Sequence, residues 1–192
     1  MEHETRPTSE SASMTDEILT SEPLRAKTRH PIVVMGVQGC GKSTVGRQLS
    51  DALGIRFEDG DDLHSVEARA KMASGHPLTD ADRLPWLTRI SERIRGSVDA
   101  GEPVVVACSA LKREYRDLMR AIVPTLVFVE LYGDQTLIAE RLTHRNHEYM
   151  PPTLLDSQFA TLEPLAADEA GLRIDLATTP DNIVGRALQF LQ

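Results

Sequence analysis

The sequence predicts an α/β fold in which helices cover both faces of a parallel sheet. Apolar runs that fit short strands alternate with amphipathic runs that fit helices, and this alternation requires crossover connections between parallel strands. Residues 103–108, PVVVAC, are almost wholly apolar, as expected for a strand buried on both faces. A glycine-rich loop at residues 36–44, GVQGCGKST, joins the first strand to the first helix.

The composition fits one enzyme domain. The 192 residues are enough for a single core, and 41% of them are hydrophobic. The formal net charge of −8 argues against a nucleic-acid-binding protein, which would carry a basic face. The cysteines, Cys40 and Cys108, lack metal-ligand spacing and fit reduced thiols in a reducing compartment. No run is long and apolar enough to be a membrane span or a signal peptide, so we expect a cytoplasmic protein without a membrane partner.

The predicted elements begin at Pro31. Residues 1–29 are rich in Ser, Thr and Glu and predict a disordered tail, whereas residues 30–192 are expected to form the domain. Strands are expected at residues 31–35, 55–58, 103–108, 125–133 and 172–176. Helices are expected at residues 42–53, 63–75, 79–101, 110–122, 134–145 and 180–192. Between residues 146 and 170 the alternation stops, which indicates an irregular excursion from the core.

The loop at residues 36–44 has the full spacing of a phosphate-binding loop. Gly36 and Gly41 let the backbone wrap a phosphate group, and the following helix N-terminus adds a favourable dipole. Lys42 can reach the β- and γ-phosphates, and the hydroxyl of Ser43 can bind Mg²⁺. A strand before the loop and a helix after it argue against a chance glycine-rich turn.

Acidic residues follow the second strand in the segment EDGDDLH. The carboxyl ends of parallel strands gather ligands, so Asp59 and Asp61 are expected near the γ-phosphate if this strand neighbours the loop. One carboxylate can then hold hydrated Mg²⁺, and the other can orient or deprotonate a substrate hydroxyl. The alternative is a solvated acidic turn.

Basic residues after later strands fit an anion clamp and a lid. Lys112 and Arg116 lie one helical turn apart and fit either a solvated basic face or a clamp for an anionic substrate, with Arg83 as a second clamp candidate. Arg141 and Arg145 fit either favourable charges at a helix C-terminus or a lid that excludes water from ATP. For Trp86, the only tryptophan, core packing is the favoured interpretation.

Five segments in order resemble the gluconokinases of the small phosphate-loop kinase type. They are GVQGCGKST, DGDDLH, KMASGHPLTDADRLPWL, CSALKREYRD and HEYMPPTLLDSQFATLEPL, and the resemblance runs from Pro31 to Gln192. It implies ATP- and Mg²⁺-dependent phosphorylation of the 6-hydroxyl of D-gluconate, whose product feeds the pentose phosphate pathway. It also implies a three-layer α/β/α P-loop kinase fold with five parallel strands in the order 2-3-1-4-5, a lid at about residues 145–165, and a homodimer.

The motifs and the resemblance together give a set of expected site residues. The expected ATP ligands are Gly36, Val37, Gln38, Gly39, Cys40, Gly41, Lys42, Ser43, Thr44 and Arg141. The expected catalytic residues are Lys42, Asp61 and Arg145, and the expected metal ligands are Ser43 and Asp59. The expected substrate ligands are Asp61, His64, Arg83, Lys112, Arg116 and Gln158.

Other function classes explain fewer of these features. A shikimate kinase would share the fold, but Gln158 stands where the resemblance places a substrate arginine of those enzymes. A GTP-dependent switch protein would need an Asn-Lys-x-Asp guanine motif, which the sequence lacks. A passive nucleotide-binding module would need neither the paired Asp59 and Asp61 nor a basic lid.

Overall fold

The computed structural model describes residues 28–143 and 152–192. The predicted tail lies outside the described residues as far as residue 27. The first part of the predicted lid, up to residue 151, lies outside them as well, and Arg145 with it.

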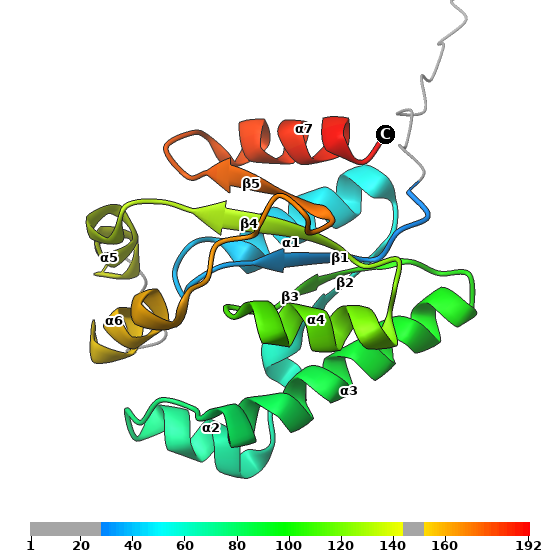
Figure 1. Ribbon diagram of the computed structural model, residues 1–192. Coiled ribbons are helices and arrows are strands. Elements are labelled where there is room, and N and C mark those ends of the chain that lie inside the picture. The colour runs from blue at the N-terminus through cyan, green and yellow to red at the C-terminus, as the bar shows by residue number, and fades with distance from the viewer. Residues whose placement is uncertain (1–27, 144–151) are drawn as a thin grey trace, which may run out of the picture.

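The described strands form a single parallel sheet in the order β2-β3-β1-β4-β5, which confirms the order implied by the resemblance. The strands are β1 (Ile32–Met35), β2 (Arg56–Asp59), β3 (Val104–Ala107), β4 (Val127–Tyr132) and β5 (Gly171–Asp175). All of them point the same way, so their carboxyl ends meet at one edge of the sheet (Figure 1). Each strand lies within three residues of its predicted bounds.

Helices lie on both faces of the sheet and complete the three layers (Figure 1). The described helices are α1 (Lys42–Leu53), α2 (Val66–Ala73), α3 (Asp80–Asp99), α4 (Arg113–Ile122), α5 (Gln135–Thr143), α6 (Pro152–Thr161) and α7 (Pro180–Phe190), with a short 3₁₀ turn, η1 (Gly60–Leu63). Helices α1 and α7 pack together on one face, and α3 and α4 pack together on the other. Helices α5 and α6 lie beyond the carboxyl ends of the strands.

The alternation of side chains along β1 divides the core into two parts. Ile32 and Val34 belong to the cluster under α1 and α7, and Val33 and Met35 belong to the cluster under α3 and α4. All four side chains are completely buried, because helices cover both faces of this central strand. The phosphate-binding loop therefore starts from a strand that is buried on both faces.

Two predicted helices begin three residues later than expected, and one helix was missed. The helix expected at residues 110–122 begins at Arg113. The helix expected at residues 63–75 begins only at Val66, because Asp59–Leu63 turns sharply and Ser65 caps α2 by accepting the Ala68 N–H. The excursion expected between residues 146 and 170 contains a helix, α6, that the sequence analysis missed. Its first described residue is Pro152, and proline is well tolerated in the first helical turn.

Candidate active site

The phosphate-binding loop connects β1 to α1 as the motif predicts. Gly36 has a φ of 137°, and a Cβ atom there would lie 2.5 Å from the carbonyl oxygen of Leu131, so no larger residue fits. The Gly36 N–H donates to the Ser109 carbonyl at 3.3 Å, which ties the loop to the end of β3. Helix α1 begins at Lys42, so its positive dipole end faces the loop.

Lys42 lines two cavities next to the loop. One lies over the phosphate-binding residues and is called the phosphate cavity, and the other is a polar pocket beside it. Its Nζ donates to the Val37 carbonyl at 3.0 Å, which holds the ammonium group at the centre of the loop. Arg47, one helical turn after Ser43, lines the phosphate cavity as well. Sequence reasoning missed Arg47, although its position on the first helix was a usable signal.

An oxygen-rich pair lies beside the loop. The Ser43 hydroxyl donates to Asp59 Oδ2 at 2.8 Å, and Asp59 Oδ1 accepts the Asp61 N–H at 3.2 Å. These are hard oxygen donors of the kind that Mg²⁺ prefers. Within residues 28–143 and 152–192, no group of three or more His, Cys, Asp or Glu side chains could hold a metal ion. A hydroxyl and one carboxylate therefore fit Mg²⁺ that takes its remaining ligands from phosphate and water.

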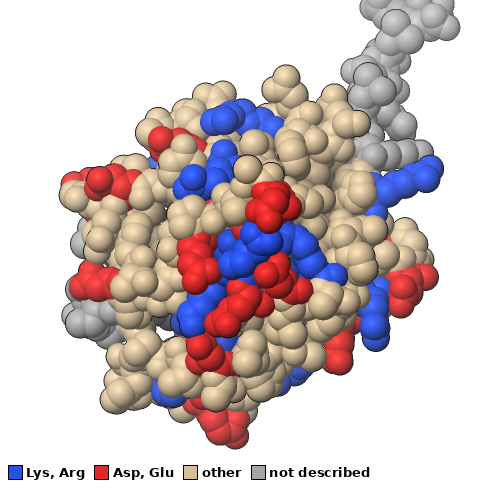
Figure 2. Space-filling view, in the orientation of Figure 1, with Lys and Arg blue, Asp and Glu red and all other residues tan. Residues whose placement is uncertain are grey.

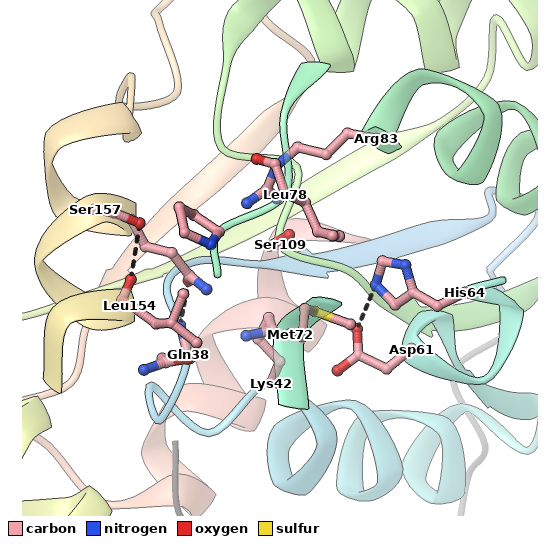
Figure 3. Close-up of a pocket in the computed structure, with 12 residues that line it drawn as sticks. Gln38, Lys42, Asp61, His64, Met72, Leu78, Arg83, Ser109, Leu154 and Ser157 are labelled. Carbon is pink, nitrogen blue, oxygen red and sulfur yellow. Dashed lines mark hydrogen bonds and ion pairs between the residues drawn. The ribbon is translucent and has the colours of Figure 1, made fainter. Parts of the chain in front are cut away.

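Asp61 lies between the phosphate cavity and a neighbouring polar pocket, which we call the acceptor pocket (Figure 3). Partial loss of hydration in the cleft raises the pKa of its carboxyl. The contact with His64 and the charges of Lys42 and Arg83 outweigh this effect, so the pKa lies below its usual value. The side chain is 73% exposed, so a substrate hydroxyl can reach the carboxylate.

The acceptor pocket collects several predicted substrate ligands. Its polar lining comes from Gln38, Lys42, Asp61, His64, Arg83, Ser109, Ser157 and Gln158, and its apolar lining from Met72, Pro77, Leu78 and Leu154. Arg83 reaches over the pocket from the first turn of α3, and its Nε donates to the Leu78 carbonyl at 3.3 Å (Figure 3). The apolar residues were missed, because nothing in the local sequence marks them as pocket residues.

Gln158 joins helix α6 to the phosphate-binding loop. Its Oε1 accepts the backbone N–H of Gln38 at 2.7 Å, across 120 residues of sequence. This bond places α6 over the loop, where the described part of the predicted lid meets the nucleotide site.

A third cavity lies beside the loop. It is lined by Gly39, Cys40, Gly41, Thr44, Val45, Arg141, Leu176, Thr178, Pro180 and Ile183. The Arg141 guanidinium donates to the Leu176 carbonyl at 3.0 Å, so it forms one wall of this cavity. The predicted role of Arg141 as an ATP ligand stays a prediction.

Arg116 does not belong to the acceptor pocket, so its prediction as a substrate ligand is corrected by the structure. The side chain is completely buried, and its Nε and Nη2 each donate to Glu169 at 2.7 Å. The helical spacing indicated a basic face, but residues 163–170 cover this face. Figure 2 shows acidic and basic side chains interleaved over the α4 side of the molecule.

Lys112 also lies outside the described lining of the acceptor pocket. Its Nζ contacts Asp80 at 2.8 Å and Glu114 at 3.2 Å, so two carboxylates already hold the ammonium group. Lys112 therefore links α4 to the start of α3 instead of clamping a substrate.

Neither cysteine is a candidate nucleophile. Burial raises the pKa of the Cys108 thiol to about 12, so the reactive thiolate is not formed at neutral pH. Cys40 is completely buried within the loop, where its size suits the close approach of the Gly36 backbone.

Comparison with known proteins decides the family. A gluconokinase from Gluconobacter oxydans is 42% identical over 84% of this chain and 90% of its own length. A crystal structure of a gluconokinase from Sinorhizobium meliloti is 46% identical and superimposes with a TM-score of 0.79, covering 86% of this chain and 93% of that one. This chain belongs to the gluconokinase family. The gluconokinase resemblance seen in the sequence is thereby confirmed.

Two further comparisons concern the domain and its fold. Residues 32–165 match the family model described as an AAA domain. An APS kinase structure from Mycobacterium tuberculosis shares the fold, with 21% identity and a TM-score of 0.62. None of the helices in the described ranges is long and apolar enough to cross a membrane.

Proposed function

We propose that this chain transfers the γ-phosphoryl group of ATP to the 6-hydroxyl of D-gluconate, giving 6-phospho-D-gluconate and ADP. Membership of the gluconokinase family supports the reaction. The observation that carries it in the structure is the position of Asp61, which lines both the phosphate cavity and the acceptor pocket. A hydroxyl bound at Asp61 would therefore lie next to the γ-phosphoryl group of a nucleotide bound in the phosphate cavity.

The transfer needs little covalent chemistry from the protein. The O6 oxygen of gluconate forms a bond to the γ-phosphorus, and the bond from that phosphorus to the β–γ bridging oxygen breaks, leaving the electron pair on ADP. The proton of O6 passes to the Asp61 carboxylate and then to solvent. The lowered pKa keeps Asp61 ionised at neutral pH, so it is ready to orient and accept this proton.

The loop stabilises the charge that moves during the transfer. Backbone N–H groups of residues 36–44, the dipole of α1 and the ammonium group of Lys42 surround the phosphate chain. Ser43 and Asp59 would hold Mg²⁺, which supplies further positive charge to the β- and γ-phosphates when it is bound. Arg145 is expected to add charge from the lid, and this role stays a prediction because the residue lies outside the described part of the chain.

The far side of the acceptor pocket suits a sugar acid. Arg83 reaches over the pocket opposite Lys42 and Asp61, so it can bind the carboxylate of gluconate while O6 lies at Asp61 (Figure 3). Ser109, Ser157 and Gln158 offer polar groups to the hydroxyls between these ends, whereas the buried His64 side chain is directed at Asp61. The predicted homodimer and cytoplasmic location stay predictions, and sedimentation of the purified chain would test the first.

A coupled ADP-release assay tests the proposed function. The acceptors are gluconate, shikimate, glucose, adenylate and nucleosides, each with MgATP. We expect ADP release to rise strongly with gluconate and to stay near the background rate with the others. If gluconate gives no stimulation, the proposed substrate is wrong. If shikimate gives the larger response, the chain is a shikimate kinase of the same fold instead.

A further inference from the structure

Trp86 holds the first residue of the turn that carries Asp61. The indole is 1% exposed, and its Nε1 donates to the Gly60 carbonyl oxygen at 2.7 Å. Gly60 itself is pressed against the end of β3, because a Cβ atom there would lie 2.5 Å from the Ala107 carbonyl oxygen. The start of the turn is therefore fixed between β3 and the indole of α3.

Trp86 also contacts His64, the residue that caps the end of this turn. Its rings stack on the imidazole of His64 with centroids 4.1 Å apart and planes inclined by 14°. The His64 side chain is 3% exposed, and its backbone N–H donates to the Asp61 carbonyl at 3.2 Å. One indole thus contacts Gly60, directly before Asp61, through its N–H, and His64, three residues after Asp61, through its ring face.

The stack decides what His64 presents to the carboxylate. His64 Nε2 lies 3.6 Å from Asp61 Oδ1 (Figure 3). His64 Nδ1 is buried and has no hydrogen-bond partner among the described residues. A proton on Nδ1 would be a buried donor without an acceptor, which is unfavourable, so the favoured tautomer carries its proton on Nε2, toward Asp61. The stacked indole restricts tilting of the imidazole out of this plane, and the Asp61 carboxylate favours the orientation with Nε2 toward it.

Core packing alone does not require these contacts. A space-filling residue needs only bulk and an apolar surface, whereas Trp86 donates a buried hydrogen bond to one residue and stacks nearly parallel on another. Asp59 supports the same turn from the phosphate side, because its Oδ1 accepts the Asp61 N–H. Asp61 is therefore held from two sides, by the metal-site carboxylate and by the indole.

We propose that Trp86 is a positioning residue for phosphoryl transfer, which acts through Gly60 and His64 to aim the Asp61 carboxylate at the acceptor hydroxyl. The proposal rests on the proposed function, since it assigns Asp61 the role of orienting and deprotonating that hydroxyl. Trp86 touches neither substrate in this scheme, so its effect on the reaction passes through Asp61 alone.

A double-mutant cycle tests this coupling. Trp86→Phe keeps an aromatic ring over His64 and removes the N–H that holds Gly60. We expect it to lower kcat about tenfold, equivalent to about 1.4 kcal/mol, with an unchanged KM for ATP. In an Asp61→Asn background the same change should cost nothing further, because the group that it positions no longer works. An equal loss of kcat in both backgrounds would overturn the proposal.

Ile94→Val is the matched control for packing. Ile94 is also completely buried on α3, but two turns beyond Trp86, so its replacement should lower the melting temperature without lowering kcat. Trp86→Leu removes both contacts and is expected to lower kcat more than Trp86→Phe. If Trp86→Leu does not fold, the cycle with Trp86→Phe still decides the question.

A readout without turnover separates this proposal from the proposed function. The chain has one tryptophan, so its indole N–H gives one signal in a ¹⁵N-resolved NMR spectrum. We expect slow hydrogen exchange of this N–H in the wild-type chain and a shift of its signal in His64→Gln. Fast exchange, or a signal that does not move in His64→Gln, would contradict the contacts of Trp86 with Gly60 and His64 and overturn the proposal. If the signal behaves as expected but gluconate is not phosphorylated, the substrate assignment fails, and the cycle is run with the acceptor that the assay identifies.

Discussion

The hydroxyl of Ser43 donates a 2.8 Å hydrogen bond to Asp59, although the strand that precedes Ser43 and the strand that ends at Asp59 are not neighbours. Strand β3 lies between β1 and β2, ends at Ala107 and is followed by the small residues Cys108 and Ser109. The two side chains can therefore meet across the end of β3. This contact is what joins the phosphate-binding loop to the acidic turn and makes one site of two sequence motifs.

The proposed metal role of Asp59 predicts a change in the Mg²⁺ requirement. Asp59→Asn keeps a similar shape but removes the charge that favours the cation. We expect the Mg²⁺ concentration for half-maximal activity to rise about tenfold or more, equivalent to at least about 1.4 kcal/mol of lost affinity. Titration of activity with Mg²⁺ at fixed ATP measures this. Glu58→Gln, one residue earlier on β2, makes the same charge change outside the site, and an equal shift there would contradict the role of Asp59.

Asp61→Asn should abolish the proton acceptor while leaving the nucleotide site intact. We expect kcat to fall about a hundredfold or more, as for the loss of other general bases, with little change in the KM for ATP. Steady-state kinetics with both substrates checks this, with Asp51→Asn on the outer surface of α1 as the control. A parallel loss of ATP affinity would show that Asp61 is structural.

The lowered pKa of Asp61 also predicts the acidic limb of the pH–rate profile. The carboxyl must be ionised to accept the proton, so activity should persist as the pH falls and decline only below the usual aspartate pKa of 3.8. The profile of kcat/KM, measured where the chain remains folded, checks this. A decline centred near neutral pH would mean that another group is the base.

Arg83→Met should weaken the binding of gluconate specifically. A charge-assisted hydrogen bond to a carboxylate is worth about 1.5–3 kcal/mol, so we expect the KM for gluconate to rise roughly tenfold to a hundredfold. The KM for ATP should not change. The preference of the variant for gluconate over the uncharged alcohol glucitol should shrink as well. Arg95→Met, an exposed change on the same helix, is the control, and an unchanged KM for gluconate in Arg83→Met would contradict the assignment.

The buried position of Arg116 predicts a stability effect. Arg116→Met leaves the Glu169 carboxylate buried without its main partner, so we expect the free energy of unfolding to fall by about 3–5 kcal/mol. Lys112→Met removes a partly exposed cation and should cost about 1 kcal/mol or less. Denaturant unfolding measures both. A folded Arg116→Met variant with a raised KM for gluconate would restore the substrate role that the structure excludes.

Glu169 makes part of this stability depend on pH. Burial raises its pKa, but hydrogen bonds from Arg116, the Ala166 N–H and Arg120 outweigh it and lower the pKa from 4.5 to about 2. A depressed folded-state pKa gives stability that is fully present above pH 4.5 and is lost as the pH falls toward 2. The melting temperature of the wild type should therefore approach that of Glu169→Gln as the pH falls through this range. A constant difference would contradict the assignment.

The sequence by itself determined the features that depend on local pattern. The glycine spacing around Lys42, the strand before it and the helix after it form a contiguous unit, so its structure and ligand follow from neighbouring residues. The order of strands and helices follows in the same way from hydrophobic periodicity. The resemblance of five segments to gluconokinases then predicted the family, the sheet order and the substrate.

Only the tertiary structure decided which polar groups face the ligands. Helical spacing placed Arg116 on a basic face, but its partner Glu169 lies 53 residues further along the chain, and nothing in the spacing shows that a later segment covers this face. Separation along the chain likewise hid the contact between Gln158 and Gln38 and the stack of Trp86 on His64. Periodicity reports which side of an element is apolar. The burial, partner and charge environment of each polar side chain depend on segments that only folding brings beside it.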